Sequence, residues 1–476
     1  MITRRPVAAA MAALCFAPVA TRAWAQEPGI TGTWTGVLVA GQAKLRLRLV
    51  LAADGAVKLY SLDQGGISIS GTAVSTKPDQ IAVEIPAVGG RFAGKLTSAD
   101  RLEGTWSQGG SDFPLMMMRG EAGLPKPPTR VAPPPPAALT QALLEQLREA
   151  SGSPALGAAA QRKGGKTLAW VTGHRRVGTA DVVGLQDRWH LGSITKSMTA
   201  TLIGRLVESG QLRWDDTVGD LLGDVAPDMR PEYRPVTLRH LGSHRSGLPG
   251  DLSSEQISRF RFSSESADAR DERLAYARLA LAMPPKGQAG TRYEYANNGY
   301  VVLGAIIERR LKKPWEIAIR ERLFEPLKLT SVGFGAPDLA RATQPSGHTA
   351  QGDAVLRAFP GSDNPAVLGP AGRVHMSLRD LIAYLAAHRD RSALLAPETW
   401  RTLHTPPFGG NYAMGWMVRP NGALWHNGAN GLWYAMATFH PDQGFAAAAV
   451  VNDGRIAIVS PIIDRAVQDA ILSAQA

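Results

Sequence analysis

Cysteine is almost absent from this chain of 476 residues, where Cys15 is the only one. It lies in an apolar stretch that we interpret below as part of a cleaved leader. Leu14 precedes it, at a position where lipid attachment favours a small residue. The mature chain should therefore contain no cysteine. This excludes disulfide bonds, thiol catalysis and metal sites with cysteine ligands.

Long hydrophobic runs are missing as well. The apolar stretch 7–20 is interrupted by Pro18 and is shorter than the roughly 20 residues that a membrane-spanning helix requires. A short positive segment precedes it, and the small-x-small sequence Ala23-Trp24-Ala25 follows it. This order predicts a signal peptide over residues 1–25 and export, with the periplasm as the expected location, rather than a membrane anchor. Arg4-Arg5 leaves both the general and the twin-arginine export routes open.

Metal-binding motifs and concentrated charge are also lacking. The ten histidines form no His-Glu-x-x-His or His-x-His-x-Asp motif, and His240 with His244 has no acidic partner at ligand spacing. We therefore expect no metal and no cofactor. The net charge of +11 falls to +8 without the three arginines of the leader, and the basic residues are scattered. A solvated surface is favoured over an anionic cell-wall partner, and nucleic acid is not an expected partner.

The first part of the mature chain has the pattern of an all-β domain. Residues 44–51 alternate basic and apolar side chains, and turns such as Asp54-Gly55 recur at hairpin intervals. Trp34 and Trp106, each in a Gly-Thr-Trp sequence, predict core positions on strands that meet to close a small barrel or sandwich. We predict such a domain over residues 26–123. Its pattern resembles small calycin-like β-domains, and it carries no chemistry that we can identify.

Proline separates this domain from the rest of the chain. Prolines cluster within residues 124–138, including four in succession at 133–136, which predicts a semi-rigid linker. Residues 139–476 then begin with an amphipathic helix and a strand pair and end with two strands and a helix. Between them lies a helical, loop-rich region. This order predicts an α+β fold in which an antiparallel sheet, built from both ends, is flanked by helices and carries an inserted helical subdomain.

Ser193 and Lys196 are the first candidate catalytic pair. Lys196 is the third residue after Ser193 at the start of a helix-favouring run, so both side chains lie on one helical face about one turn apart. A serine hydroxyl needs a base within hydrogen-bond reach, and Lys196 can serve if its pKa is lowered from about 10.4. The Ser-x-x-Lys spacing alone is common enough to arise by chance. It is, however, the only such spacing in this chain.

Two further segments could complete a site. Tyr295 and Asn297 form the only Tyr-x-Asn in the chain, and in extended backbone their side chains point the same way. Later, His426 could orient the substrate or Tyr295, as part of a substrate-binding or oxyanion segment. Gly428 and Ala429 follow it, where glycine permits a close backbone approach and the next amide could donate to an oxyanion. Taken alone, each segment is more often structural, as a loop tyrosine or a core histidine.

The ordered set of these segments resembles the serine β-lactamase and penicillin-binding protein superfamily. The resemblance is to the branch with class C β-lactamases, D-Ala-D-Ala carboxypeptidases and related esterases. It runs from about residue 139 to the C-terminus and includes the non-catalytic segments 237–249, 370–377 and 412–416. It implies a β-lactamase/transpeptidase-like fold that forms an acyl-enzyme. It also implies roles for the matching residues: Ser193 as nucleophile, Lys196 sharing its proton, Tyr295 as general base and later acid, Asn297 contacting the substrate amide, and the amides of Ser193 and Ala429 as the oxyanion hole.

One departure bears on the substrate. The third motif of β-lactamases and penicillin-binding proteins is usually Lys-Thr-Gly or Lys-Ser-Gly, and His426-Asn427-Gly428 stands in its place. A histidine is mostly neutral at pH 7, so a fixed charge for a substrate carboxylate is lost. We therefore expect an exported serine hydrolase acting on a small-molecule or peptide ester or amide, with cell-wall-derived compounds among the candidate substrates. The alternatives are a class C-like β-lactamase and a catalytically weak penicillin-binding or cell-wall-sensing protein.

Overall fold

A computed structural model describes most of the chain. The described residues are 29–40, 43–52, 54–62, 68–77, 79–108, 111–120, 135–260, 268–338, 343–351, 354–358 and 362–475. The predicted signal peptide, residues 1–25, and most of the predicted linker, residues 124–138, lie outside them. Within these ranges, no helix is long and apolar enough to cross a membrane.

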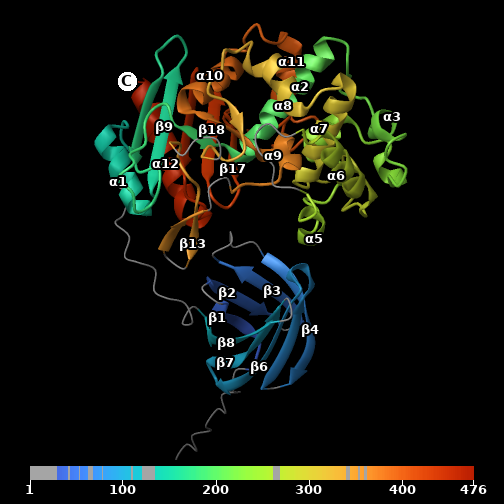
Figure 1. Cartoon of the computed structure of the whole chain (residues 1–476), viewed down its shortest axis with the longest axis vertical. Helices are drawn as coiled ribbons and strands as arrows, with labels where there is room; N and C mark the ends of the chain where they lie inside the picture. The colour runs from blue at the N-terminus through green and yellow to red at the C-terminus, as the bar shows by residue number, and fades with distance from the viewer. Residues whose placement is uncertain are drawn as a thin grey trace, which may run out of the picture.

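The N-terminal region is a closed antiparallel barrel of eight strands (Figure 1). Consecutive strands pair, and β1 closes the barrel against β8. Trp34 on β1 and Trp106 on β7 are buried in its core, as the sequence predicts. The strand that meets β1 is β8 rather than the one with Trp106, because the chain adds one more hairpin before closure. The strands are β1 (Gly32–Ala40), β2 (Ala43–Leu51), β3 (Ala56–Ser61), β4 (Ser68–Lys77), β5 (Gln80–Ile85), β6 (Gly90–Ser98), β7 (Arg101–Gln108) and β8 (Ser111–Arg119), with a short helix η1 (Pro86–Val88).

The second region is built on an antiparallel sheet of six strands in the order β10-β9-β19-β18-β17-β16. Two strands come from its beginning and four from its end, so the prediction of a sheet made from both ends is confirmed. The strands are β9 (Ala155–Arg162), β10 (Leu168–Gly173), β16 (Met417–Val418), β17 (Leu424–Ala429), β18 (Tyr434–His440) and β19 (Phe445–Val451).

Helices cover both faces of this sheet (Figure 1). Along β19, Ala447 and Ala449 pack against α1 (Gln141–Ser151) and α12 (Ile456–Gln475). Ala446 and Ala448 point to the opposite face, toward α10 (Leu378–Arg389). This period of two follows from the pleat of a strand, and strands buried on both faces can be apolar throughout. The small alanine side chains let helices approach both faces of the sheet closely.

The chain between β10 and β16 forms the helical subdomain and two small sheets. The three-stranded sheet has the order β11-β15-β12, and a hairpin joins β13 to β14. The helix α2 (Thr195–Glu208) is buried along most of its length. The other elements are β11 (Arg188–His190), η2 (Gly192–Ile194), α3 (Val218–Leu222), η3 (Pro231–Tyr233), α4 (Leu238–Gly242), α5 (Ser254–Ile257), α6 (Arg270–Ala282), α7 (Asn297–Leu311), α8 (Trp315–Ile319), η4 (Arg320–Phe324), β12 (Gly333–Phe334), β13 (His348–Gln351), β14 (Ala354–Arg357), η5 (Ala366–Leu368), α9 (Gly369–Gly372), β15 (Val374–Ser377) and α11 (Pro397–His404).

Candidate active site

Ser193 lies where the chain turns from β11 into α2. It is the middle residue of the short helix η2, and α2 begins directly after η2 ends. Gly192 precedes it with φ of +50°, a left-handed conformation that glycine adopts without a steric cost. A Cβ atom at Gly192 would lie 2.4 Å from the amide nitrogen of Ala429. Glycine is therefore required here, and its small size brings the serine turn against β17.

Lys196 is fully buried, with its amine at the centre of three polar contacts. Its Nζ lies 2.9 Å from Ser193 Oγ, 2.7 Å from Asn297 Oδ1 and 2.7 Å from the carbonyl oxygen of Ala371. Burial lowers the pKa of Lys196 to about 7, although the carboxylate of Asp251 opposes the shift. A neutral amine has two N–H donors and one lone pair. The two carbonyl oxygens take the donors, which leaves the lone pair facing the serine hydroxyl.

Tyr295 lies beside this pair, just before α7 begins. The Lys196 amine lies 4.9 Å from the centre of the Tyr295 ring, and the Tyr295 hydroxyl is near enough to Ser193 for that residue to influence its pKa. Desolvation of the hydroxyl raises the pKa of Tyr295 above its usual value of 10. The residue as a whole is 36% exposed, whereas its hydroxyl is desolvated. The resting tyrosine is therefore a neutral phenol that can donate a proton.

Asn297, the first residue of α7, connects the lysine to a carboxylate. Its Oδ1 accepts from Lys196, and its Nδ2 donates to Asp251 Oδ1 over 2.8 Å. The Asp251 contact orients the amide, because a carboxylate oxygen accepts and so faces Nδ2 rather than Oδ1. Asp251 is exposed and lines the cleft. The sequence did not single out Asp251, which follows the family-like segment 237–249.

The strand β17 supplies the other wall. The neighbouring strand β16 pairs with β17 only as far as Trp425, so the backbone beyond that point faces the serine turn. A Cβ atom at Gly428 would lie 1.9 Å from the carbonyl oxygen of Leu191 and 2.6 Å from the amide nitrogen of Ser193. Gly428 thus lets the two backbones meet. This approach places the Ala429 amide next to the Ser193 amide, where two donors can bind one oxyanion.

His426 is buried under β17 with both ring nitrogens engaged. Nδ1 contacts the carbonyl oxygen of Asn427, and Nε2 lies 2.9 Å from the hydroxyl of Tyr412. Burial, reinforced by the charge of Lys196, lowers the pKa of His426 to about 3. The side chain is therefore neutral, and both nitrogens already bind protein atoms. The His426 side chain therefore supports the site from behind the cleft wall and is not arranged to bind a substrate carboxylate.

The segment around this site matches a known family. The model of the Beta-lactamase family matches residues 140–458, about two thirds of the chain. This chain belongs to the Beta-lactamase family. Penicillin-binding protein 4 of Amycolatopsis lactamdurans is 28% identical over 303 residues, which cover 59% of this chain and 76% of that protein. Protein flp of Staphylococcus aureus (strain COL) is 22% identical, and the match spans 56% of this chain but only about half of flp.

Solved structures show the same fold. D-amino acid amidase from Ochrobactrum anthropi SV3 superposes with a TM-score of 0.57 at 21% identity, covering 71% of this chain and 98% of the amidase. EstCE1, a hydrolase with promiscuous acyltransferase activity, superposes with a TM-score of 0.59 at 18% identity, and the match covers 70% of this chain and 97% of EstCE1. These matches confirm the β-lactamase/transpeptidase-like fold that the sequence resemblance predicts. At these identities they show the fold alone.

The cleft of this Beta-lactamase-family site is small, about 260 Å³. Ser193, Asn297 and Ala429 line it, as do residues that the sequence did not point to. Of the described lining residues none is a lysine or arginine, and the one charged side chain is Asp251. Within the described chain, no three histidine, cysteine or acidic side chains are placed to hold a metal ion. The newly found lining residues are Asp251, Ile257, Asn364, Leu368, Ala371, Gly372 and Asn430.

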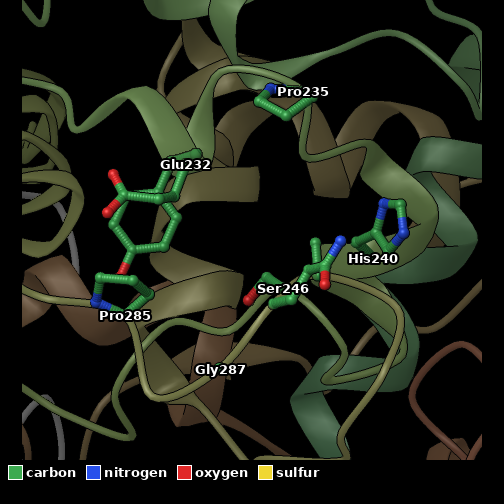
Figure 2. A pocket seen from close by; sticks show the side chains of 9 residues that line it. Glu232, Pro235, His240, Ser246, Pro285 and Gly287 are labelled. Atoms are coloured by element: carbon green, nitrogen blue, oxygen red, sulfur yellow. The ribbon is translucent and has the colours of Figure 1, made fainter.

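A larger cavity of about 690 Å³ lies in the helical subdomain (Figure 2). Glu232, Pro235, His240, Ser246 and Pro285 stand around its opening. It contains none of the residues that surround Ser193. His240 is stacked on Phe408, with 4.4 Å between ring centres. Cavity size alone would therefore have pointed away from the nucleophile, whereas buried polar groups point to it.

The serine turn also rests on a buried pair, His190 and Asp363, that no sequence motif singled out. His190 Nδ1 accepts the amide of Gly192 over 3.2 Å, so its Nε2 carries the proton and donates to Asp363 Oδ2 over 3.0 Å. Asp363 Oδ1 accepts from Asn430 in the cleft wall over 2.8 Å. Interactions with His190, Arg373 and Asn430 hold the pKa of Asp363 at about 2 despite its burial. This pair links the serine turn to the end of β17.

Proposed function

We propose that this chain is an exported serine hydrolase that forms an acyl-enzyme on Ser193 from a neutral or cationic ester or amide. One observation carries the proposal: the buried Lys196 amine has two carbonyl acceptors and a third contact, 2.9 Å long, to Ser193 Oγ. That arrangement suits an amine that takes the proton of a nucleophile. The names of relatives and structural neighbours, which include an amidase, a hydrolase and a penicillin-binding protein, support the same reaction class.

Acylation begins with the neutral lysine. The lone pair of Lys196 takes the proton from Ser193, and Oγ forms a bond to the carbonyl carbon of the substrate. The carbonyl oxygen becomes an oxyanion, which accepts from the amides of Ser193 and Ala429. Such preorganised donors are worth about 10²- to 10³-fold in rate. Because the pKa of Lys196 is about 7, about half of the molecules carry an unprotonated amine that can act as a base near neutral pH.

Collapse of this intermediate needs an acid at the leaving group. Tyr295, which burial keeps protonated, gives its proton to the departing nitrogen or oxygen while the bond to the acyl carbon breaks. The ammonium of Lys196 then returns a proton to Tyr295. Water attacks the acyl-enzyme in the reverse sense, so the acid is released and Ser193 regains its proton. We thus assign the resting base to Lys196 and the acid to Tyr295.

The charge of the cleft favours one substrate class. Its charged lining residue is the carboxylate of Asp251, and His426 is neutral with both nitrogens occupied. A substrate carboxylate would find no lysine or arginine among the described lining residues and would be repelled by Asp251. An ammonium group would be attracted. At a few ångströms in a water-filled cleft, one such charge pair is worth on the order of 1 kcal/mol, or about fivefold in the rate constant.

The test compares matched substrates that differ in charge. We expect kcat/KM for p-nitrophenyl acetate and D-alanine p-nitroanilide to exceed that for p-nitrophenyl succinate, after correction for leaving-group reactivity. Asp251→Asn should lower the ratio of kcat/KM for the cationic substrate to kcat/KM for the acetate ester about fivefold; the ratio cancels any effect of the variant on Lys196, which both substrates share. A preference for the succinate ester, or rapid hydrolysis of benzylpenicillin, would favour the class C-like β-lactamase instead.

A third outcome would identify a penicillin-binding protein. The relative penicillin-binding protein 4 makes slow acylation without turnover the second candidate. It predicts a lasting penicillin adduct and no ester hydrolysis. Export is tested separately by N-terminal sequencing of the secreted protein, where a mature N-terminus at Gln26 is expected and an intact leader in the cytoplasm would contradict it.

A further inference from the structure

Behind the catalytic residues, three buried side chains form a continuous hydrogen-bonded chain. They are His244, which follows α4, Tyr412, which precedes β16, and His426 on β17. Their exposed fractions are 0, 3 and 3%. His244 Nε2 lies 3.2 Å from the Tyr412 hydroxyl, and that hydroxyl lies 2.9 Å from His426 Nε2. The chain therefore crosses from the helical subdomain to the sheet.

The direction of every proton in this chain follows from its two ends. At one end, the backbone amide of Ala296 donates to His244 Nδ1 over 3.1 Å, so the proton of His244 is on Nε2 and points to Tyr412. At the other end, His426 Nδ1 contacts the carbonyl oxygen of Asn427, so that nitrogen carries the proton. His426 Nε2 is then an acceptor. The single hydroxyl of Tyr412 accepts from one histidine and donates to the other.

Both ends of the chain adjoin catalytic groups. Ala296 lies between Tyr295 and Asn297, and the ring of His244 packs on the ring of Tyr295 with 4.3 Å between their centres. His426 is two residues before Gly428 on the strand whose amide would bind the oxyanion. Burial keeps the pKa of His244 well below its usual value, so both histidines are neutral and can hold this polarity.

His244 also has an unusual backbone. Its φ of +57° is in the left-handed region, which a non-glycine residue enters at a cost of order 1 kcal/mol. This conformation directs the ring between Tyr295 and Tyr412 while the carbonyl of His244 accepts the amide of Glu294 over 2.9 Å. A fold retains such strain where the surrounding contacts require it.

We infer that Tyr412 and His244 are positioning residues, which fix Tyr295 and Asn297 relative to β17 and hold His426 as its Nδ1–H tautomer. Neither side chain touches the cleft. Their effect is on the geometry between the acid and the oxyanion amides, where a shift of about 1 Å can cost up to 10²-fold in rate. The inference rests on the proposed function for its kinetic part, whereas the tautomers depend on the fold alone.

The first test replaces Tyr412 by phenylalanine, which keeps the ring and removes the hydroxyl. We expect Tyr412→Phe to lower kcat for p-nitrophenyl acetate about tenfold to a hundredfold, with KM changed by less than about threefold. Tyr233→Phe is the matched control, because Tyr233 is fully buried and its hydroxyl donates to the carbonyl of Met283 over 3.1 Å, away from this chain. It should lose a similar amount of stability and keep kcat within about twofold.

A second pair of variants separates chemistry from packing. His244→Gln keeps one acceptor and one donor near the end of the side chain, whereas His244→Leu keeps bulk and loses both. We expect kcat of His244→Gln to be at least about five times that of His244→Leu when the two variants have equal melting temperatures. Equal kcat in the two variants would mean that His244 acts only through packing and would overturn its assigned role.

Nitrogen-15 NMR of histidine-labelled protein tests the tautomers without any substrate. The resonances are assigned by comparison with His426→Gln and His244→Gln. Wild type should show an Nδ1–H proton on His426 and an Nε2–H proton on His244, and Tyr412→Phe should shift the Nε2 resonances of both histidines, because each Nε2 loses its hydrogen-bond partner. The opposite tautomers, or unchanged kcat in Tyr412→Phe, would overturn the inference. If wild type hydrolysed no ester, the proposed function would fail while the tautomers still decided the inference.

Discussion

The barrel and the hydrolase region use their interiors in different ways. Among the barrel residues that the structure describes, Thr35 and Ser61 are the buried polar side chains, and the rest of the core is apolar. The hydrolase region buries an amine, carboxylates and several histidines, among them Lys196, Asp363 and His426. Burying such groups costs several kcal/mol unless each finds a partner. Lys196 and Asp363 lie next to the serine turn, whereas other buried charges, such as Arg273 and Asp469, pair with side chains elsewhere. A lowered lysine pKa beside a serine therefore locates the chemistry more directly than cavity size does.

The contrast predicts where a single change will remove activity without unfolding the protein. Ser193→Ala deletes one partly buried oxygen and with it the nucleophile. We expect hydrolysis of p-nitrophenyl acetate to fall by at least about 10³-fold, since nothing nearby can replace the covalent step. The melting temperature should stay within a few degrees of wild type. Retained turnover would mean that the buried polar cluster is structural, as it would be in any large core.

Gly428→Ala tests the close approach of two backbones. The added Cβ would meet the Leu191 carbonyl at 1.9 Å and the Ser193 amide at 2.6 Å, so β17 must move away from the serine turn. We expect kcat to fall about 10²- to 10³-fold, the cost of losing an oxyanion donor. Gly287→Ala is the control, because no atom lies within 4 Å of its added Cβ. An equal loss in both variants, or none in Gly428→Ala, would contradict the assignment.

The pH dependence tests whether the buried amine is the base. The pKa of Lys196 is lowered to about 7, so the amine is protonated below that pH and has no lone pair for the serine proton. We therefore expect kcat/KM to rise as pH increases through about 7, falling about tenfold for each pH unit below it. Lys196→Arg, which stays charged, should be inactive at every pH. If kcat/KM rose only near pH 10, the pKa of Lys196 would not be lowered, which would contradict the prediction.

The smallest effect on activity is expected from the barrel. Trp34 is fully buried, and its indole donates to the carbonyl of Ile30 over 2.8 Å. Trp34→Ala should cost the barrel about 3–5 kcal/mol of stability, measured by denaturant unfolding, through the lost contacts and the cavity left behind. Its kcat for p-nitrophenyl acetate should remain near that of wild type. A fall in kcat comparable to that of Gly428→Ala would show that the barrel takes part in catalysis.

The sequence predicted the parts of this molecule that depend on local pattern. The alternating residues of the barrel and the strands of both chain ends indicate a sheet directly, because side-chain period follows from strand geometry. Ser193, Lys196, Tyr295 and Asn297 could be chosen because their spacings are unique in the chain. The structure brings all four together.

Other residues could not be found this way, because their role depends on long-range packing. Asp251 and Asp363 are ordinary acidic residues in sequence, and only the fold places one in the cleft and the other under the serine turn. His244 and Tyr412 belong to segments that resemble the family, yet their spacing reveals no contact with His426. The prediction for His426 itself was a substrate or oxyanion contact. The structure puts its ring nitrogens on Tyr412 and Asn427, a partnership that periodicity cannot show.

The most direct test of the central claim is covalent trapping. Wild type, mixed with p-nitrophenyl acetate and quenched in acid within the first turnovers, is analysed by intact mass and then by peptide mapping. The account predicts one added acetyl group on the peptide that contains Ser193, and none in Ser193→Ala. Ester turnover with no adduct, or with the acetyl group on another residue that survives in Ser193→Ala, would contradict it.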